Sequence, residues 1–252
     1  MTSFPVPVFD HIVINARDRV DAAADRYREL GFDLTARGYH TLGSVNHCAV
    51  FGTDYLEIVG IEPGQKKIRA EILATPEGLN GIVFATNDAN GLYETLHAAG
   101  APVEPPGDFS RPVTMPNGIE DARFRVVRVN ADATPYGRVY FCQHFTPELV
   151  WRDEWRHHAN GATALAGAVI LATEPDKTAM LYRQLFGPDA VKPVSGGFSL
   201  AVGQARLDIL TQAWGETAQG ADRLLGLSIK TTETPRVVPA NEAFGSVLEF
   251  VR

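Results

Sequence analysis

The sequence predicts an α+β protein built from four tandem repeats, each with a strand at both ends and a helix between them. Four short apolar segments open the repeats, at residues 9–15, 80–86, 166–172 and 225–230. Four apolar segments with an acidic or polar residue close them, at residues 55–59, 139–144, 206–210 and 247–251. Because one such unit cannot bury its apolar face alone, the copies must pack on one another, and paired curved sheets enclose a cavity.

Helix patterns fill the middle of the first three repeats. Apolar residues recur at spacings of three and four over residues 18–30, 88–99 and 176–186, which indicates helices that pack one face. A glycine follows each pattern, where a left-handed residue ends a helix. The fourth repeat differs, because residues 231–245 are rich in proline and β-branched residues. We expect its helix to be lost or shortened.

A charged segment divides the chain into two unequal halves. The sequence predicts two modules in residues 1–150, a helix-like connector over residues 151–164 and two shorter modules in residues 165–252. We expect the first module to pair with the second, although pairing of the first with the fourth is a further possibility. The halves could also pair across a homodimer.

The composition bounds the class of protein. A hydrophobic content of 45% and a charged content of 21% are ordinary for a globular chain with a core. The net charge of -7 argues against nucleic acid as a partner, since phosphate binding needs clustered positive charge. No apolar run reaches the roughly 18 residues of a membrane span, and the N-terminus lacks a signal pattern. These features predict a cytoplasmic protein, in which Cys48 and Cys142 are buried thiols.

Each half repeats twice an order of one strand, one helix and three strands. This arrangement resembles the vicinal oxygen chelate superfamily and most closely its glyoxalase-like branch. The resemblance rests on residues 10–14, 30–32, 38–46, 54–58 and 142–148. It implies tandem βαβββ modules, four in number with the last degenerate, paired into barrel-like curved mixed sheets with helices outside. It also implies a divalent metal, Fe, Mn, Zn or Ni, held inside the cup by residues from the first and last strands of each module.

Three residues occupy positions where such a metal would be held. The resemblance places His11 on the first strand and Glu57 on the closing strand, with His144 as a third ligand. Imidazole and carboxylate together suit these metals and leave positions open for a bidentate substrate. Gly81 and Gly167, which open the second and third modules, offer no ligand. The alternative is that His11 and Glu57 form a buried structural pair.

A loop flanked by glycines carries the candidate acid–base group. His40 and Asn46 lie in this loop, and the resemblance makes both plausible lining groups of the cup. His40 would act as an acid or base, or as a hydrogen-bond partner of the substrate, and Glu57 is a second candidate for moving a proton. The alternative is ordinary turn chemistry, with Asn46 bonding its own backbone and His40 solvated.

Arginines form a further candidate site. Arg123 and Arg125 share a face of one expected strand and could clamp a carboxylate or keto-acid substrate, and Arg111 has similar standing. The alternative is that these arginines are solvated or paired with nearby acids.

Two kinds of function remain open from the sequence. One is a metal-assisted lyase, isomerase or dioxygenase that acts on a small oxygen-rich molecule. The other is a non-catalytic cup that sequesters an aromatic or hydrophobic molecule. Its walls would be aromatic, supplied by Tyr39, Phe51, Tyr55, Tyr140 and Phe145.

Overall fold

The computed structural model describes residues 4–252. Its first module comprises β1 (Phe9–Asn15), α1 (Val20–Glu29), β2 (Gly38–Tyr39), β3 (Val45–Val50) and β4 (Tyr55–Gly60). A short helix follows, α2 (Ala70–Ala74), and the second module then comprises β5 (Gly78–Ala85), α3 (Ala89–Ala98), β6 (Gly107–Met115), β7 (Gly118–Arg128) and β8 (Arg138–His144).

The second half repeats this order on a smaller scale. Its third module comprises β9 (Ala162–Leu171), α4 (Pro175–Phe186), β10 (Val191–Val194), β11 (Gly197–Val202) and β12 (Ala205–Leu210). A small hairpin of β13 (Gln212–Ala213) and β14 (Glu216–Thr217) leads to β15 (Arg223–Thr231), β16 (Arg236–Val238) and β17 (Val247–Val251). The fourth module has no α-helix between its strands, as the sequence predicts, because prolines interrupt that stretch.

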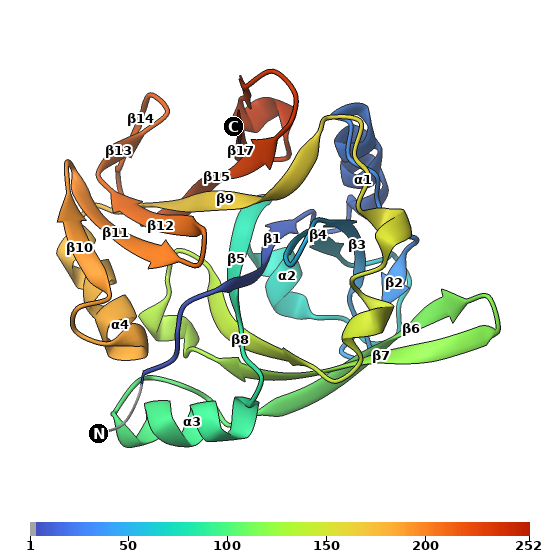
Figure 1. Cartoon of the computed structure of the whole chain (residues 1–252), viewed down its shortest axis with the longest axis horizontal. Helices are drawn as coiled ribbons and strands as arrows, with labels where there is room; N and C mark the ends of the chain where they lie inside the picture. The colour runs from blue at the N-terminus through green and yellow to red at the C-terminus, as the bar shows by residue number, and fades with distance from the viewer. Residues whose placement is uncertain (1–3) are drawn as a thin grey trace.

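Two sheets organise the molecule (Figure 1). The first has the strand order β2-β3-β4-β1-β5-β8-β7-β6, and the second has the order β10-β11-β12-β9-β15-β17-β16. In each sheet two modules meet through their opening strands, β1 antiparallel to β5 and β9 antiparallel to β15. The expected fold class is therefore confirmed, and the first module pairs with the second.

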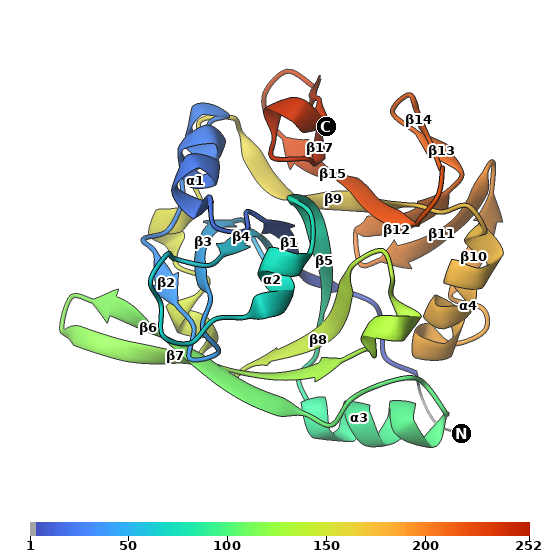
Figure 2. The same ribbon diagram turned by 180° about the vertical axis from the view of Figure 1, so that it is seen from behind.

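The first sheet curls into a cup, and α2 lies within its curve (Figure 2). Asn15 at the end of β1 anchors this segment, because its side-chain amide donates to the carbonyl of Ile72 at 2.9 Å. Ile72 belongs to the apolar cluster inside the cup, together with Val13 and Val83. The sequence patterns do not predict α2, whose five residues are too few to show a helical periodicity.

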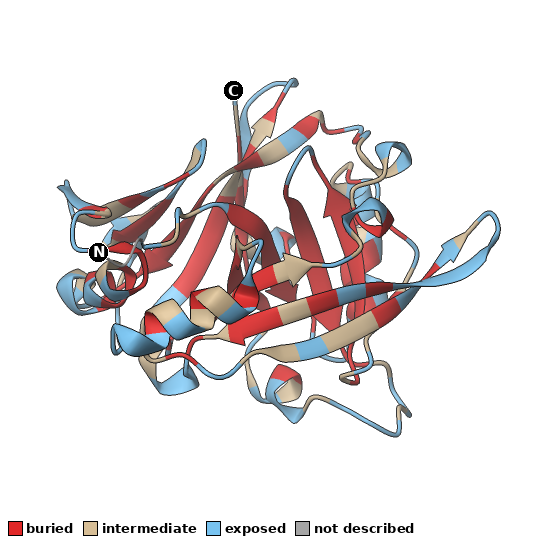
Figure 3. Cartoon of the chain, turned by 60° about the horizontal axis from the view of Figure 1, so that its bottom comes forward, coloured by how far each residue is buried: buried red, intermediate tan, exposed pale blue. Residues whose placement is uncertain are grey.

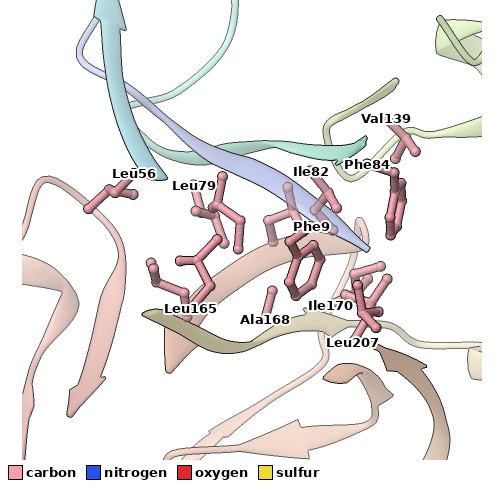
Figure 4. Close-up of a cluster of buried hydrophobic side chains, with 14 of the residues drawn as sticks. Phe9, Leu56, Leu79, Ile82, Phe84, Val139, Leu165, Ala168, Ile170 and Leu207 are labelled. Atoms are coloured by element: carbon pink, nitrogen blue, oxygen red, sulfur yellow. The ribbon is translucent and has the colours of Figure 1, made fainter. Parts of the chain in front are cut away.

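The outer face of the cup packs on the second sheet through the main apolar layer. Figure 4 shows this layer, in which the first sheet contributes Phe9, Leu56, Leu79, Ile82, Phe84 and Val139, and the second contributes Leu165, Ala168, Ile170 and Leu207. Burial is continuous along the central strands and is lost at the tip of the β6–β7 hairpin (Figure 3). The curved first sheet is therefore supported from outside, because its outer face is closely packed on the second half of the chain.

A β-bulge at Asp10 sets which side chains point into the cup. Along the β1–β5 ladder, Phe9 pairs with Phe84 but His11 pairs with Val83, so Asp10 is an extra residue on β1. Phe9 therefore faces outward, with its ring 5.8 Å from that of Phe84. Simple alternation predicts that Phe9 shares a face with His11, which is wrong because of this bulge. Its effect is to place Asp10 and His11 side by side at the cup.

The connector between the halves is not the predicted helix. Within residues 151–164 it contains one short 3-10 helix, at Asp153–Trp155, and Trp151 packs against the apolar cluster inside the cup. His158 anchors it: its Nδ1 accepts from the Asp33 N–H at 3.0 Å, and its Nε2–H donates to the Val50 carbonyl at 2.9 Å. None of the helices in residues 4–252 has the length and hydrophobicity of a membrane span.

The anchoring of His158 predicts a loss of stability in mild acid. Burial lowers the pKa of His158, because a charged imidazole would lose its hydration there. Protonation would also break the hydrogen bond that Nδ1 accepts from the Asp33 N–H. Its stabilisation is therefore present above the unfolded pKa of about 6.5 and is lost as the pH falls through it. We expect the free energy of unfolding in urea to be lower at about pH 5.5 than at about pH 8, and less so in H158Q. An equal pH dependence in H158Q would contradict this role.

Candidate functional site

A cavity of about 1020 Å³ lies in the cup and reaches the second half of the chain. The first two modules line it with His11, Asn46, Glu57, Arg138 and Tyr140, among other residues. The segment between β14 and β15 adds a wall that includes Gln219 and Asp222, and β15 adds Leu225. Both predicted halves therefore line one cavity. The sequence of the first half alone does not predict that the second half contributes to it.

Glu57 is the central carboxylate of the cavity. It lies on β4 at 6% exposure, and its Oε1 accepts a hydrogen bond from the Asn46 side-chain amide at 2.7 Å. Its Oε2 is 3.8 Å from His11 Nε2, and its Oε1 is 3.8 Å from His40 Nε2. Burial alone would raise the pKa of Glu57, but the attraction of His11 and His40 in their protonated forms and the hydrogen bond from Asn46 hold it below its ordinary value. Glu57 is therefore an anion between two imidazoles.

His11 is oriented by the carboxylate beside it. Asp10 Oδ1 accepts the Nδ1–H of His11 at 2.5 Å, which leaves Nε2 as the free nitrogen. That nitrogen lies 3.1 Å from the Tyr140 hydroxyl, and the imidazole stacks on the Tyr55 ring at a centroid distance of 4.3 Å. Burial raises the pKa of Tyr140, so its hydroxyl stays protonated and donates. The free lone pair of His11 thus faces Tyr140 and Glu57.

A tight turn holds His40 at the mouth of the cup. The His40 N–H donates to the Ser44 carbonyl at 2.9 Å, and Gly43 closes the turn at a φ of 90°, which suits glycine. The imidazole Nδ1 lies 2.9 Å from the Ser44 hydroxyl. Burial lowers the pKa of His40 to about 4, which outweighs the attraction of Glu57. His40 is therefore a neutral imidazole at neutral pH rather than a solvated turn residue.

His144 lies on the other side of Asp10. Its Nε2 is 2.9 Å from Asp10 Oδ2, so one carboxylate bridges two imidazoles. Burial would raise the pKa of Asp10, but His144 and His11 together hold it far below its ordinary value. The donor atoms of Asp10, Cys142 and His144 lie within 4.8 Å of one another, close enough to hold a cation. The Nδ1 of His144 is buried without a hydrogen-bond partner.

Two sets of donors therefore lie side by side, joined by the hydrogen bond between Asp10 and His11, and their chemistry differs. In the set of Asp10, Cys142 and His144, the carboxylate already accepts from two imidazoles, and burial raises the pKa of the Cys142 thiol, which disfavours the thiolate. In the set of His11 and Glu57, an imidazole nitrogen whose hydrogen-bond partner is the neutral Tyr140 hydroxyl lines the cavity together with an ionised carboxylate. A carboxylate behind a metal-binding imidazole is a common supporting arrangement, and Asp10 supplies it for His11. The second set fits a divalent cation better.

The structure brings together most of the other predicted site residues. Asn46, Tyr55, Arg111 and Tyr140 all line the cavity with His11, His40 and Glu57. Arg123 and Arg125 do not, because Phe124 and Val126 take the inward positions of β7. They line a separate, shallower pocket, where Arg125 pairs with Asp108 at 2.6 Å. The predicted clamp therefore lies outside the main cavity.

The aromatic wall expected for a sequestering protein is mostly elsewhere. Tyr39 and Phe145 are exposed, and Phe51 packs on the outer side of the cup. Only Tyr55 and Tyr140 of the five face the cavity, and Tyr140 is engaged with His11. Three other aromatic residues, Phe109, Phe124 and Tyr136, line the cavity together with the polar and charged groups.

The second half carries no equivalent of this site in its sheet. Asp208 and Glu249 occupy the strand positions that correspond to Glu57. Each accepts a hydrogen bond from a serine, Ser199 and Ser228 respectively, at 2.6 Å. Asp208 also pairs with Arg206 at 2.7 Å. These carboxylates are satisfied strand residues.

Three site residues escape prediction from the sequence. Simple alternation assigns Asp10 to the outer face, and only the bulge brings it to the cup. The sequence predicts Cys142 as a core thiol, which its burial supports, but it also lies beside Asp10 and His144. Arg138 belongs to no motif, although a charged residue at the start of an apolar strand is a usable signal.

Comparisons with known proteins agree with this architecture. No curated protein matches the sequence. Over 98% of this chain and 99% of the other, the structure resembles a hypothetical protein from Staphylococcus aureus, with a TM-score of 0.72 and 16% identity. It also resembles a mutant 4-hydroxymandelate synthase from Streptomyces coelicolor, with a TM-score of 0.54, 12% identity and coverage of 91% of this chain and 72% of that one. At these identities the likeness concerns the fold alone.

The family assignment comes from the sequence itself. The glyoxalase-like domain family matches residues 9–186, which include the first two modules, the connector and the opening of the third module. This match and the paired βαβββ modules confirm the resemblance to the vicinal oxygen chelate superfamily. The chain belongs to the glyoxalase-like domain family.

Proposed function

We propose that the chain is a metal-dependent lyase or isomerase that moves a proton on a small oxygen-rich molecule bound in the cavity. The observation that carries the proposal is the ordered row of Asp10, His11 and Glu57, with neutral His40 on the other side of Glu57. Buried ionisable groups in such a row cost folding free energy, which favours a functional reason for them.

His11 and Glu57 are the residues that would hold the cation. His11 presents Nε2 and Glu57 presents its carboxylate, 3.8 Å apart at the cavity wall. Asp10 fixes the imidazole through its other nitrogen, so His11 needs no reorientation. The cation would polarise the substrate oxygens and stabilise negative charge that develops on them.

His40 is the group that takes and returns the proton. It is neutral at neutral pH, because burial lowers its pKa, and Ser44 holds its ring in place. The Glu57 anion beside it would stabilise the imidazolium that forms when His40 accepts a proton. Tyr140 stays protonated and donates to His11 Nε2, and with a cation on that nitrogen its hydroxyl could donate to a substrate oxygen instead.

A dioxygenase reaction is a second chemistry for the same cation site, supported by the ligand types alone. It would not require His40 to change its protonation state. Proton transfer explains why His40 lies beside Glu57, whereas a dioxygenase reaction gives His40 no role. We therefore favour the lyase or isomerase.

Hydrogen exchange tests the proposal across a whole class of candidate substrates. Untagged protein, supplied separately with Fe, Mn, Zn or Ni, is incubated in deuterated water with a panel of small 2-hydroxy and 2-oxo carboxylates. We expect proton NMR to show loss of a carbon-bound proton, or conversion, for at least one compound and only with metal present. Compounds that bind in the cavity without exchange or conversion would instead support the sequestering function.

A further inference from the structure

Arg138 and Arg111 are two of the three arginines in the cavity wall that have no acidic partner within residues 4–252, the third being the partly exposed Arg128. Arg138 donates from Nε to Asn80 Oδ1 at 3.0 Å, but its Nη2 is buried without any hydrogen-bond partner. Arg111 is buried at 5% exposure in the same cavity. Within residues 4–252, neither arginine takes part in an ion pair, whereas their neighbour Arg69 pairs with Glu71 at 2.6 Å.

An unpaired guanidinium in this position is costly. A buried donor without a partner loses its hydration and gains nothing in return, and a buried charge loses more. Burial accordingly lowers the pKa of Arg138, the direction expected when the cationic form is destabilised. An anion that entered the cavity would remove this cost, because it would supply the missing acceptor.

The position of Arg138 relates the anion to the reacting groups. Arg138 begins β8, where it pairs with Gly81 of β5. Tyr140 follows two residues later on the same face, and both residues line the cavity with Glu57. Arg111 and His40 line the same cavity, so both arginines share it with the Glu57–His40 pair.

We propose that the substrate carries an anionic oxygen group, a carboxylate or a phosphate, that binds Arg138 directly and is further attracted by Arg111. This proposal rests on the proposed function, because it names the chemical class of the substrate that the same cavity binds. With the anionic end on Arg138, the rest of a small molecule lies against His11, Glu57 and His40. Arg138 thus selects and orients the substrate.

Anion binding can be measured separately from turnover. Inorganic phosphate and propanoate are titrated at constant ionic strength into the full chain, and binding is followed by calorimetry and by the thermal midpoint. We expect saturable binding in the wild type and at least about tenfold weaker binding in R138M. The tighter of the two anions identifies the group that Arg138 accepts. R125Q is the matched control, because Arg125 lies in the shallower pocket and pairs with Asp108, and it should bind like the wild type.

Two further measurements separate anion binding by Arg138 from proton transfer and from a structural role. H40Q should bind both anions like the wild type, so that a failure of proton transfer and a failure of anion binding are distinguishable. Without anion, R138M should have a higher thermal midpoint than the wild type, because an unpaired buried charge is removed. Wild-type anion affinity in R138M would overturn the proposal. So would a lower midpoint in R138M together with no saturable binding in the wild type, since Arg138 would then be structural.

Discussion

Replacing His40 by glutamine is expected to lower turnover about 10²–10⁴-fold, the usual loss when a general acid or base is removed. Glutamine can keep a hydrogen bond to Ser44, so the turn should survive the change. Metal content should be unchanged, because His11 and Glu57 remain in place. The rate of hydrogen exchange or conversion, measured by proton NMR on a compound that the wild type converts, gives the result.

His47 offers a matched control for this substitution. It is also a buried histidine whose pKa is lowered by burial, but its Nδ1 bonds to the Thr35 carbonyl at 2.8 Å and it does not line the cavity. H47Q should therefore keep the wild-type rate even where it loses some stability. A full rate in H40Q would contradict this role of His40 and assign the proton transfer to another group of the cavity, with Glu57 as the next candidate.

Much of the architecture could be predicted because it depends on local patterns. The alternation of apolar residues and the glycines after each helix are properties of short segments, and they repeat three times. The loss of the fourth helix follows from the prolines within its segment. The ligand positions on β1 and β4 come from the resemblance, which covers the same segments.

The missing parts depend on contacts between distant segments. The bulge at Asp10 is a feature of how β1 pairs with β5, so simple alternation assigns that residue to the wrong face. The pairing of His144 with Asp10 joins residues 134 positions apart. The wall formed by the segment before β15 requires the docking of one half on the other. None of these has a signature within a single segment.

The arginines show the same distinction. Arg123 and Arg125 form a visible pattern in the sequence, yet the pleat of β7 turns them away from the main cavity. Arg138 stands alone in its segment, and its importance becomes visible only when its unpaired Nη2 is located in the cavity wall. Spacing indicates which residues share a face, but not which face encloses the site.

Replacing His11 by alanine is expected to remove the metal. His11 supplies the oriented nitrogen of the cation site, and Glu57 alone is a weak ligand in a cavity of this size. The substitution also frees one hydrogen-bonding position of Asp10, which keeps its contact with His144. The fold should therefore persist, with a modest loss of thermal stability. H97A is the control, because His97 is exposed on α3 and lies outside the cavity.

The most direct measurement is the metal content of untagged wild type, H11A and H97A, determined by elemental mass spectrometry. A metal-dependent site built on His11 and Glu57 predicts close to one Fe, Mn, Zn or Ni ion per chain in the wild type and in H97A, and almost none in folded H11A. Wild-type protein that holds no metal, even after incubation with each ion, would contradict it. The row of Asp10, His11 and Glu57 would then be a buried structural network.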